Sequence, residues 1–331
     1  MAKSKLSAKD KERGLEYLTN LHSKYESIGQ DFFDYLEGLL HSKGLKYWEY
    51  IQIDALHGLQ IPKTNFPDEI IFITYHQITE LYFKLIKHEL FQLTDEKESE
   101  FLKNENWHKR LARVNNYMRH LCNSFDVMKT GMDPHEFRLF RMALLPASGF
   151  QAVSFRHIEI MSTELINLLD KKHEPQPYTP IEEYYDNIYW KSGGIVSKTG
   201  QKTLTLTDFE EKYDRELLEW IEIYKKRNLA YLYEKSATEI KEDEKIKQLL
   251  RAYDEHFNIF WKLSHLMASG RHLPSEGTGT GGTNWRKYLP PKFQSIQFFP
   301  SVWTNEEITD WGKTAILKQF KDKFESNWMK D

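Results

Sequence analysis

The chain has 331 residues, enough to bury the core of one large domain or of two ordinary ones. Its 46 basic and 49 acidic residues leave a formal charge of -3, which excludes a general electrostatic attraction to nucleic acid or anionic lipid. The single cysteine, Cys122, excludes an internal disulfide and a cysteine-only metal cluster, and it suits a reducing cytosol. An aromatic content of 14% is typical of a packed core or of a pocket for a flat ligand.

The N-terminal segment is charged and lacks the apolar run of a signal peptide, and no uncharged apolar stretch reaches membrane-spanning length. We therefore expect a soluble cytoplasmic protein. Helical periodicity covers most of the chain and predicts an all-α fold, a multi-helix bundle. We expect one domain over residues 1–331, with an N-terminal helical arm at 1–46 and an inserted excursion at 173–206.

The first helical pattern spans about 8–41. The stretch "FPDEIIFITYHQITELYFKLIKHELFQL" then predicts one long helix with a favoured first turn at Pro67, Asp68 and Glu69. Its apolar residues fall three, four or seven apart, namely Ile71, Ile78, Leu81, Leu85 and Ile86. A further helical pattern covers about 100–130.

The stretch "DPHEFRLFRMALL" predicts a shorter helix, with Asp133 as N-cap, Pro134 in the first position, Glu136 three residues after the cap and Pro146 at the end. "SGFQAVSFRHIEIMSTELINLL" continues as a third helix. The remaining helical patterns lie at about 208–234, 240–270 and 304–328.

Only "GGIVSKTGQKTLTLTDF", residues 193–209, is typical of a strand or hairpin. It falls in the polar excursion at 173–206, which is either a lid or a surface insertion.

The stretch "GTGTGGT" matches the spacing G-x-G-x-x-G through Gly277, Gly279 and Gly282. A dinucleotide fingerprint follows a strand and opens a helix, whereas here a helical pattern precedes and Pro290 and Pro291 follow. The context therefore argues against nucleotide binding. Two interpretations remain: a flexible connector, or a loop whose amides and threonine hydroxyls approach a small anionic group such as a carboxylate.

His265 ends a series of aromatic residues, Tyr253, Phe257 and Trp261, that recur every four residues along a predicted helix. One interpretation is a core histidine hydrogen-bonded to a carbonyl group. The other is a neutral imidazole that faces a flat apolar cofactor and ligates its metal, as the proximal histidine of a haem does.

His76 lies four residues after Phe72, which again places an imidazole beside an aromatic ring on one helical face. No His-x-x-x-His or Glu-x-x-His pattern accompanies either histidine, so the sequence does not support a multi-histidine zinc or di-iron site. A single protein ligand is what haem requires.

Arg141 follows Phe137 by four residues on one predicted helical face. It is either a solvent-facing arginine whose stem covers apolar surface or a guanidinium that clamps a carboxylate beside an aromatic wall. Ser148, in "SGFQ", is by default the N-cap of the next helix.

Four motifs, "FITYHQITELYFKLIKHEL", "FRLFRMALLPASGFQAVSFRHIE", "WKLSHLM" and "GTGGT", occur in the order and approximate spacing of tryptophan 2,3-dioxygenases. The resemblance covers the chain from about Tyr47 to Tyr288. It implies a largely helical, usually tetrameric protein that binds one haem b per subunit. Such a protein inserts both atoms of O2 across the C2–C3 bond of the L-tryptophan indole and yields N-formylkynurenine.

The resemblance assigns His265 as the proximal iron ligand, with Trp261 beside the cofactor. His76 resembles the distal histidine that accepts a hydrogen bond from the indole N–H, and Phe72 packs against the indole ring. Ser148 matches the serine near the haem and the bound oxygen.

The resemblance also implies how the substrate's amino-acid end is bound. Phe137 and Arg141 match an aromatic wall and a carboxylate-binding arginine. Thr280 matches a threonine that meets the substrate's ammonium and carboxylate groups. Tyr47, Tyr50 and Ile51 resemble an N-terminal segment that reaches into a neighbouring subunit, so we expect a homotetramer.

The chain departs from the family pattern near these residues, and the region 271–280 is one residue longer than the commonest form. Trp285 replaces a small residue just past the glycine loop, and Lys262 stands where arginine is usual. Two other functions therefore stay open: a related haem oxygenase acting on another indole or aromatic amine, and a haem-binding sensor or helical scaffold without the chemistry.

Overall fold

The structure is a computed structural model that describes residues 6–95, 104–170, 173, 180–196, 199–273, 296–313 and 315–316. The regular elements within these residues are helices of the α, 3-10 or π type, which confirms the predicted all-α fold. Contacts divide the chain into two compact units, Met1–Leu59 and Gln60–Asp331. The first unit includes the predicted arm at 1–46 and extends beyond it. None of the helices in these ranges is long and apolar enough to cross a membrane.

The first unit contains α1 (Ala8–Ser27), α2 (Phe32–His41), α3 (Tyr47–Tyr50) and α4 (Ile53–His57). The helical pattern predicted at 8–41 therefore corresponds to two helices, α1 and α2. Gly29 separates them with a φ of 70°, a left-handed conformation that glycine adopts without steric cost. Asp31 then caps α2 by accepting hydrogen bonds from the backbone amides of Phe33 and Asp34. The Tyr25 and Tyr35 rings, 4.2 Å apart, pack the two helices together.

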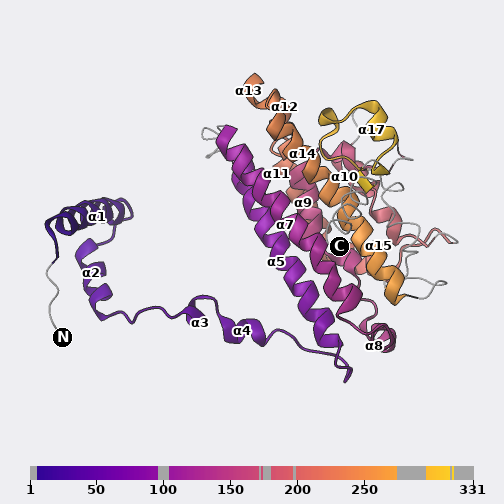
Figure 1. Cartoon of the computed structure of the whole chain (residues 1–331), viewed down its shortest axis with the longest axis horizontal. Coiled ribbons are helices and arrows are strands. Elements are labelled where there is room, and N and C mark those ends of the chain that lie inside the picture. The colour runs from indigo at the N-terminus through magenta and orange to yellow at the C-terminus, as the bar shows by residue number, and fades with distance from the viewer. Residues whose placement is uncertain are drawn as a thin grey trace, which may run out of the picture. The chain divides into compact units, whose positions relative to one another are not determined.

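The second unit contains the remaining elements, which Figure 1 labels where there is room. They are α5 (Glu69–Thr94), α7 (Asn104–Thr130), α8 (Pro134–Phe140), η1 (Arg141–Leu144), η2 (Gly149–Gln151), α9 (Val153–Ser162), η3 (Leu165–Leu168), α10 (Ile181–Asp186), η4 (Lys191–Gly194), α11 (Leu204–Tyr224), α12 (Leu229–Lys235), α13 (Thr238–Lys241), α14 (Glu244–Glu255), η5 (His256–Phe260), α15 (Trp261–His272), η7 (Pro300–Val302) and α17 (Asn305–Thr309).

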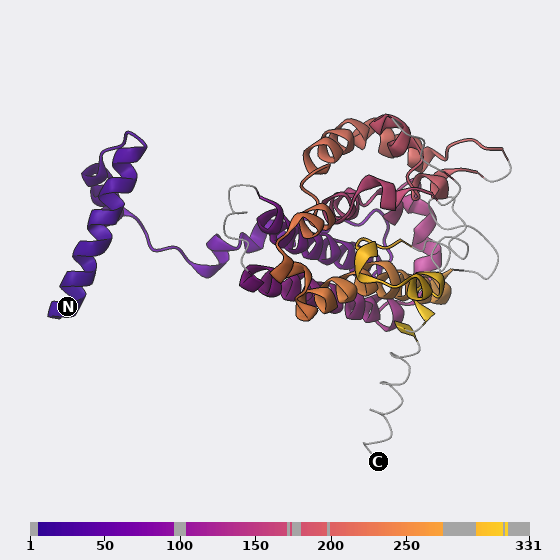
Figure 2. The same cartoon turned by 90° about the horizontal axis from the view of Figure 1, so that it is seen from above.

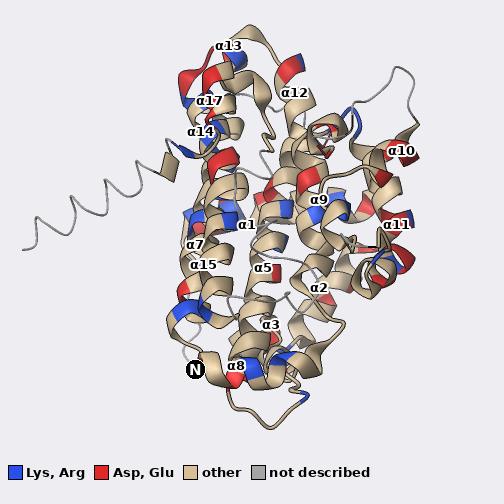
Figure 3. Ribbon diagram, turned by 90° about the vertical axis from the view of Figure 1, so that its right-hand side faces the viewer, with Lys and Arg blue, Asp and Glu red and all other residues tan. Residues whose placement is uncertain are grey.

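Helix-on-helix contacts run across this unit from α11 to α15 (Figure 2). α11 packs on α9, α9 on α5, α5 on α7, and α7 on both α14 and α15. The buried Glu89 of α5 joins α5 to α7 through Arg110, 2.8 Å away, and Arg113, 3.2 Å away. In the view of Figure 3, lysine and arginine are interspersed with aspartate and glutamate along the helices.

The face of α5 that points into the core differs from the apolar series in the sequence. Ile78, Leu81 and Leu85 are exposed, although Ile86 is fully buried. The buried face also includes Tyr75, Thr79, Phe83, Leu90 and Leu93. Each fully buried leucine or phenylalanine contributes roughly 1.5–3 kcal/mol relative to an exposed one. The periodicity therefore predicts the helix correctly, but it does not identify the buried face.

The N-terminus of α8 is connected to that of α5. Asp133 caps α8 as predicted, because its carboxylate accepts hydrogen bonds from the amides of His135 and Glu136. Glu136, however, accepts from the Asp68 amide at 3.1 Å, while the Asp133 amide donates to Asp68 Oδ2 at 2.5 Å. The α-helix ends at Phe140, before the predicted end at Pro146, and η1 follows it.

Two further predicted segments are shorter or different in the structure. The helix expected from "SGFQ" to "INLL" is α9 alone, flanked by the 3-10 turns η2 and η3. The hairpin expected at 193–209 is one isolated antiparallel bridge between Ile195 and Lys202. The chain enters α11 directly after this bridge. Thr203 is the N-cap of α11, and its hydroxyl oxygen accepts a hydrogen bond from the Leu206 backbone amide.

The helical pattern at 240–270 contains a π-helical turn, η5, between α14 and α15. Residues four apart in an α-helix lie about 40° beyond one full turn, so a four-residue repeat drifts around the helix axis. A π-turn holds more residues and offsets part of this drift. Tyr253 and Phe257 consequently lie in the core, and Trp261 and His265 follow them into a cavity.

His256, the first residue of the π-turn, is expected to make the protein less stable in acid. Burial lowers the pKa of His256 from 6.5 to about 4. The unfolded chain therefore binds a proton near pH 6.5, whereas the native chain binds it only near pH 4. The neutral His256 therefore contributes up to about 3 kcal/mol to the free energy of unfolding. This contribution is fully present above pH 6.5 and is lost as the pH falls to 4.

Denaturant titrations between pH 7 and 4 test this expectation. We expect His256→Gln to show a shallower loss of unfolding free energy with falling pH than the wild type. His120→Gln, a substitution of an exposed histidine on α7, should keep the wild-type slope. Equal slopes for wild type and His256→Gln would contradict the assignment.

Candidate functional site

The second unit contains a cavity of about 360 Å³ between α5, α7, α9, α15 and the segment after α10. This volume lies within the range of small-molecule and cofactor sites. Most of the lining is aromatic or apolar: Phe72, Tyr75, Phe83, Phe125, Met128, Phe137, Phe150, Ala152, Phe155, Tyr189, Trp190, Trp261, Ala268 and Leu273. The polar lining includes His76, Thr79, Glu80, Ser148, Arg156, Lys262, His265, Ser269 and His272.

His265 projects from α15 into this cavity between aromatic rings. The Phe125 ring of α7 stacks on the His265 imidazole with centroids 5.9 Å apart. Trp261, one turn earlier on α15, lies 4.7 Å from Phe125 and 6.3 Å from Phe155 by the same measure. Neither ring nitrogen of His265 forms a hydrogen bond within the described part of the chain. The structure therefore differs from the interpretation of His265 as a core histidine bonded to a carbonyl.

Burial keeps His265 neutral at physiological pH. Desolvation, followed by repulsion from His76, lowers the pKa of His265 to about 4. An imidazole must be neutral to ligate a metal, because the nitrogen lone pair is then available. No group of three or more histidine, cysteine or carboxylate side chains suited to a metal ion occurs among the residues that the structure describes. His265 therefore does not belong to such a group among these residues.

His76 and Phe72 of α5 line the same cavity. Their rings lie 4.1 Å apart, and His76 Nδ1 is 2.7 Å from the Phe72 carbonyl oxygen. Because a carbonyl only accepts, Nδ1 carries the proton and Nε2 keeps a lone pair. Part of the His76 side chain is exposed to solvent. The many protein atoms around the ring nevertheless desolvate it, and this lowers the pKa of His76. Nε2 of His76 is therefore suited to accept a hydrogen bond from an N–H group in the cavity.

Phe137 and Ser148 also reach the cavity, whereas Arg141 is not among its lining residues. Phe137 is buried 5.8 Å from Phe72. Ser148 caps η2 by accepting from the Phe150 amide, as the default interpretation predicts. Arg141 directly follows α8 and begins η1, and its backbone amide still donates to the Phe137 carbonyl oxygen four residues earlier.

The excursion after residue 173 forms one wall of the cavity. It is therefore more than a surface insertion. Tyr189, Trp190 and Gly193 belong to the lining. Lys191 connects this wall to α11 through an ion pair, in which its ammonium nitrogen is 3.1 Å from a carboxylate oxygen of Glu210. The same ammonium lies 3.8 Å from the centre of the Tyr185 ring. Lys191 is only 5% exposed.

We expect Lys191→Met to weaken this wall. The substitution removes a buried cation from a cluster of carboxylates and should lower the free energy of unfolding by about 2 kcal/mol. Denaturant titration measures the loss, and hydrogen exchange of the amides at 188–194 should be faster in the variant. Lys225→Met, at an exposed lysine of the α11 C-cap, should leave both quantities unchanged. Unaltered exchange in Lys191→Met would contradict the anchoring role.

Comparison with known proteins relates this geometry to a family. The sequence profile described as tryptophan 2,3-dioxygenase matches residues 37–258. The chain belongs to the tryptophan 2,3-dioxygenase family. Similar proteins named tryptophan 2,3-dioxygenase include one from Ruegeria sp. (strain TM1040), 30% identical over 271 residues, and one from Bradyrhizobium sp. (strain BTAi1), 28% identical over 276 residues. Each alignment covers 78% of this chain and 91% of the relative.

A third relative, the tryptophan 2,3-dioxygenase of Bacillus cereus, is 27% identical over 275 residues and covers 79% of this chain. Membership of the tryptophan 2,3-dioxygenase family makes the chain an oxidoreductase of that type. The resemblance inferred from four motifs is thereby confirmed.

Several residues assigned by the tryptophan 2,3-dioxygenase pattern cannot be placed at the cavity. Thr280 and Trp285 lie outside the described residues. Tyr47, Tyr50 and Ile51 belong to the first unit and are exposed. Tyr47 is the first and Tyr50 the last residue of the short helix α3. Their role in a neighbouring subunit stays a prediction.

Other lining residues were not singled out by the sequence analysis as site residues. Arg156 lies inside the quoted motif "SFRHIE", but no spacing marks it as part of a site. Tyr189 belongs to the excursion, and Lys262 attracted notice only as a departure from the usual arginine. His272 ends α15, where its Nε2 donates to the Met128 carbonyl and its ring lies 5.3 Å from Phe137.

Proposed function

We propose that this chain is a haem-dependent dioxygenase that opens the indole ring of L-tryptophan with O2 and yields N-formylkynurenine. The main support is the pair of neutral histidines, His76 on α5 and His265 on α15, that line one aromatic cavity. Family membership supports the reaction type. We further propose a cytoplasmic homotetramer, completed by the N-terminal segments of neighbouring subunits.

The residues present fit a haem. His265 supplies a half-buried neutral imidazole without a competing hydrogen bond in the described residues, and aromatic rings lie beside it. In this proposal His265 holds the iron, and Trp261, Phe125 and Phe155 cover apolar surface of the haem b group, one per subunit. When bound, the ferrous haem supplies the site at which O2 is activated.

The chain's own residues orient the substrate. His76 Nε2 would accept a hydrogen bond from the indole N–H, and Phe72 and Phe137 would pack against the indole ring. Such contacts hold C2 and C3 in one place and exclude water, so binding energy is used for orientation. His76 need not remove a proton, because a hydrogen bond to Nε2 stabilises charge that develops on the indole.

Arg141, Thr280 and Ser148 complete the proposed site. Arg141 and Thr280 would bind the substrate's carboxylate and ammonium groups, and Ser148 would lie near the bound oxygen. Because Arg141 is outside the cavity lining and Thr280 outside the described residues, the assignment of these two rests on the resemblance.

Mass spectrometry of the product tests the proposal. Ferrous, haem-reconstituted protein is incubated with L-tryptophan and O2 made of a heavy oxygen isotope. We expect a product that contains two labelled oxygen atoms. Turnover of a different indole or incorporation of one atom would support the related haem oxygenase, the alternative that holds if Trp285 reshapes the pocket for the substrate's anionic end. Binding of tryptophan without consumption would support a sensor, and absence of a haem absorption band would contradict both enzymes.

A further inference from the structure

His272, the last residue of α15, is a buried imidazole that the chemistry proposed above does not use. It lines the cavity and is 2% exposed. His272 follows His265 by seven residues, which is about two turns of an α-helix, so both imidazoles lie on one face of α15. The helix face that carries the proposed iron ligand therefore carries a second imidazole at its C-terminal end.

His272 connects three helices that meet at one end of the cavity. Its Nε2 donates a hydrogen bond to the Met128 carbonyl oxygen in the last turn of α7, where carbonyl groups lack a partner within the helix. Its ring contacts Phe137 of α8, with ring centroids 5.3 Å apart. Met128, Phe137 and Ala268 of α15 belong to one cluster of buried side chains. The hydrogen bond to α7 therefore fixes the imidazole against which the Phe137 ring packs.

Only one nitrogen of the His272 ring has a partner within the part of the chain that the structure describes. Because a carbonyl group only accepts, Nε2 carries the proton, and burial lowers the pKa of His272, which keeps the ring neutral at physiological pH. Nδ1 is buried without a hydrogen bond to any of these residues.

The surroundings of His272 indicate what its hydrogen bond contributes. The adjacent cluster consists of hydrophobic side chains. Burial of an imidazole with one unpaired nitrogen costs free energy, and an apolar side chain would fill the same place without that cost. The contribution of His272 is therefore orientation rather than stability, because its hydrogen bond holds the ring in one direction.

We propose that His272 is a positioning residue that holds the Phe137 ring in place for the indole of the substrate. This inference rests on the proposed function, in which Phe137 packs against the indole ring. Phe137 also contacts Phe72, with ring centroids 5.8 Å apart, and Phe72 contacts His76 at 4.1 Å. These four rings form a continuous wall from the residue that would accept the indole N–H to the end of α15. Without the hydrogen bond to Met128, the imidazole can turn, and the Phe137 ring can move away from the indole.

The experiment compares His272→Gln with His272→Asn in the haem-loaded protein. The glutamine amide nitrogen reaches the position of Nε2 and can donate to the Met128 carbonyl group, whereas the shorter asparagine ends at the position of Nδ1 and cannot. KM and kcat are measured for L-tryptophan, and its dissociation constant is measured from the absorption of the ferrous protein without O2.

We expect His272→Asn to raise KM and the dissociation constant about tenfold while kcat changes little. The reason is that the contact of Phe137 with the indole exists in the bound state and during the reaction alike. His272→Gln should stay within about twofold of wild type, because it keeps the hydrogen bond.

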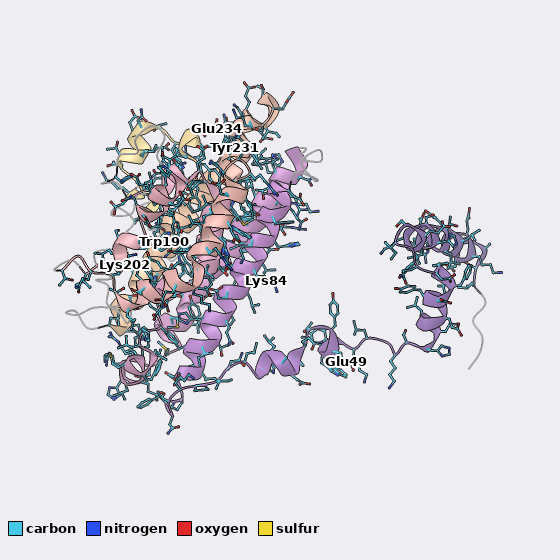
Figure 4. The ribbon with its side chains drawn as sticks, turned by 180° about the vertical axis from the view of Figure 1, so that it is seen from behind. Glu49, Lys84, Trp190, Lys202, Tyr231 and Glu234 are labelled. Carbon is cyan, nitrogen blue, oxygen red and sulfur yellow. The ribbon has the colours of Figure 1, made fainter. Side chains whose placement is uncertain are left out.

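A double-mutant cycle tests whether His272 acts through Phe137. In the Phe137→Leu background, His272→Asn should cause no further rise in the dissociation constant, because the ring that His272 positions is absent. Haem content and the denaturant midpoint show whether each variant is folded. His120→Asn, at an exposed histidine of α7, and Lys84→Met, at an exposed lysine of α5 outside the cavity lining, should match wild type (Figure 4). If His272→Asn loses haem, His272→Leu, which suits the hydrophobic cluster, takes its place in the cycle.

Two outcomes would overturn the positioning role. One is an unchanged dissociation constant in the variant that lacks the hydrogen bond to Met128. The other is an equal increase with and without the Phe137 ring. If either occurs while wild type holds haem and oxidises tryptophan, the positioning role fails and the proposed function stands. If wild type does neither, both proposals fail.

Discussion

His265→Ala is expected to give a folded protein that holds no haem and oxidises no tryptophan. The substitution removes the neutral imidazole that the proposal assigns to the iron, and the other α15 histidine of the lining, His272, is hydrogen-bonded through Nε2 to the Met128 carbonyl. His76 lies on α5 rather than α15, and the proposal assigns it to the substrate instead of the iron. Haem content falls to background, measured as the ratio of the haem band to protein absorbance after gel filtration.

The control separates ligation from folding. Alanine suits a helix interior, so the far-ultraviolet circular dichroism of His265→Ala should match that of the wild type. His120→Ala, on the exposed face of α7, should retain full haem content and activity. Added imidazole should restore part of the haem binding in His265→Ala. Unchanged haem content in that variant would refute the assignment of the ligand.

Asp254→Ala is expected to cause the second large effect, a loss of about 3–5 kcal/mol in the free energy of unfolding. The Asp254 carboxylate is fully buried and accepts from the Phe298 amide at 2.6 Å and the Phe299 amide at 3.1 Å. It also accepts from Trp303 Nε1 at 3.0 Å and from the Asn258 amide group at 3.0 Å. Alanine leaves these buried donors without an acceptor.

Denaturant titration at pH 7.5 measures the effect. Burial raises the pKa of Asp254 to about 6, so at this pH the wild-type carboxylate is ionised in the native state. Asp310→Ala, which removes an exposed carboxylate from the same C-terminal segment, should change the unfolding free energy by less than about 0.5 kcal/mol. A loss below about 1 kcal/mol in Asp254→Ala would show that other groups or water satisfy the donors.

These hydrogen bonds connect the C-terminal segment to the helix that carries the proposed ligand. Asp254 lies at the end of α14, and Asn258 lies in the π-turn before α15. Ile259 of the same turn packs under Gly312, where an added Cβ atom would lie 3.5 Å from its side chain. We therefore expect Asp254→Ala to weaken haem retention as well as stability.

The residues of the candidate site were predictable to different degrees. His265 and His76 were identified because each follows an aromatic residue by four positions on a strong helical pattern. Phe137 was identified because Arg141 follows it by four positions, and the structure places Phe137 in the cavity lining. Arg141, which follows Phe137 by four positions, is not among the lining residues, and its role stays a prediction.

Arg156, Lys262 and Tyr189 show why the rest was not predictable. They come from α9, α15 and the excursion, which lie far apart in the sequence, and no local spacing connects them. Only packing of these elements around Glu159 brings their polar groups together. A lone arginine or lysine in a helical pattern is usually a solvent-facing residue, so sequence reasoning assigns such residues to the surface.

The sequence alone determined the helical character of the chain, most helix starts, the family and the two histidines, because periodicity, capping and motif order are local properties. Tertiary structure decided which face of α5 is buried, where α8 and α9 end, and that the excursion after residue 173 forms a cavity wall. Tertiary structure also decided which charged side chains come together in the interior, such as Arg156 and Glu159. Burial and electrostatic environment depend on neighbours from distant parts of the chain, and these neighbours exist only once the helices have packed.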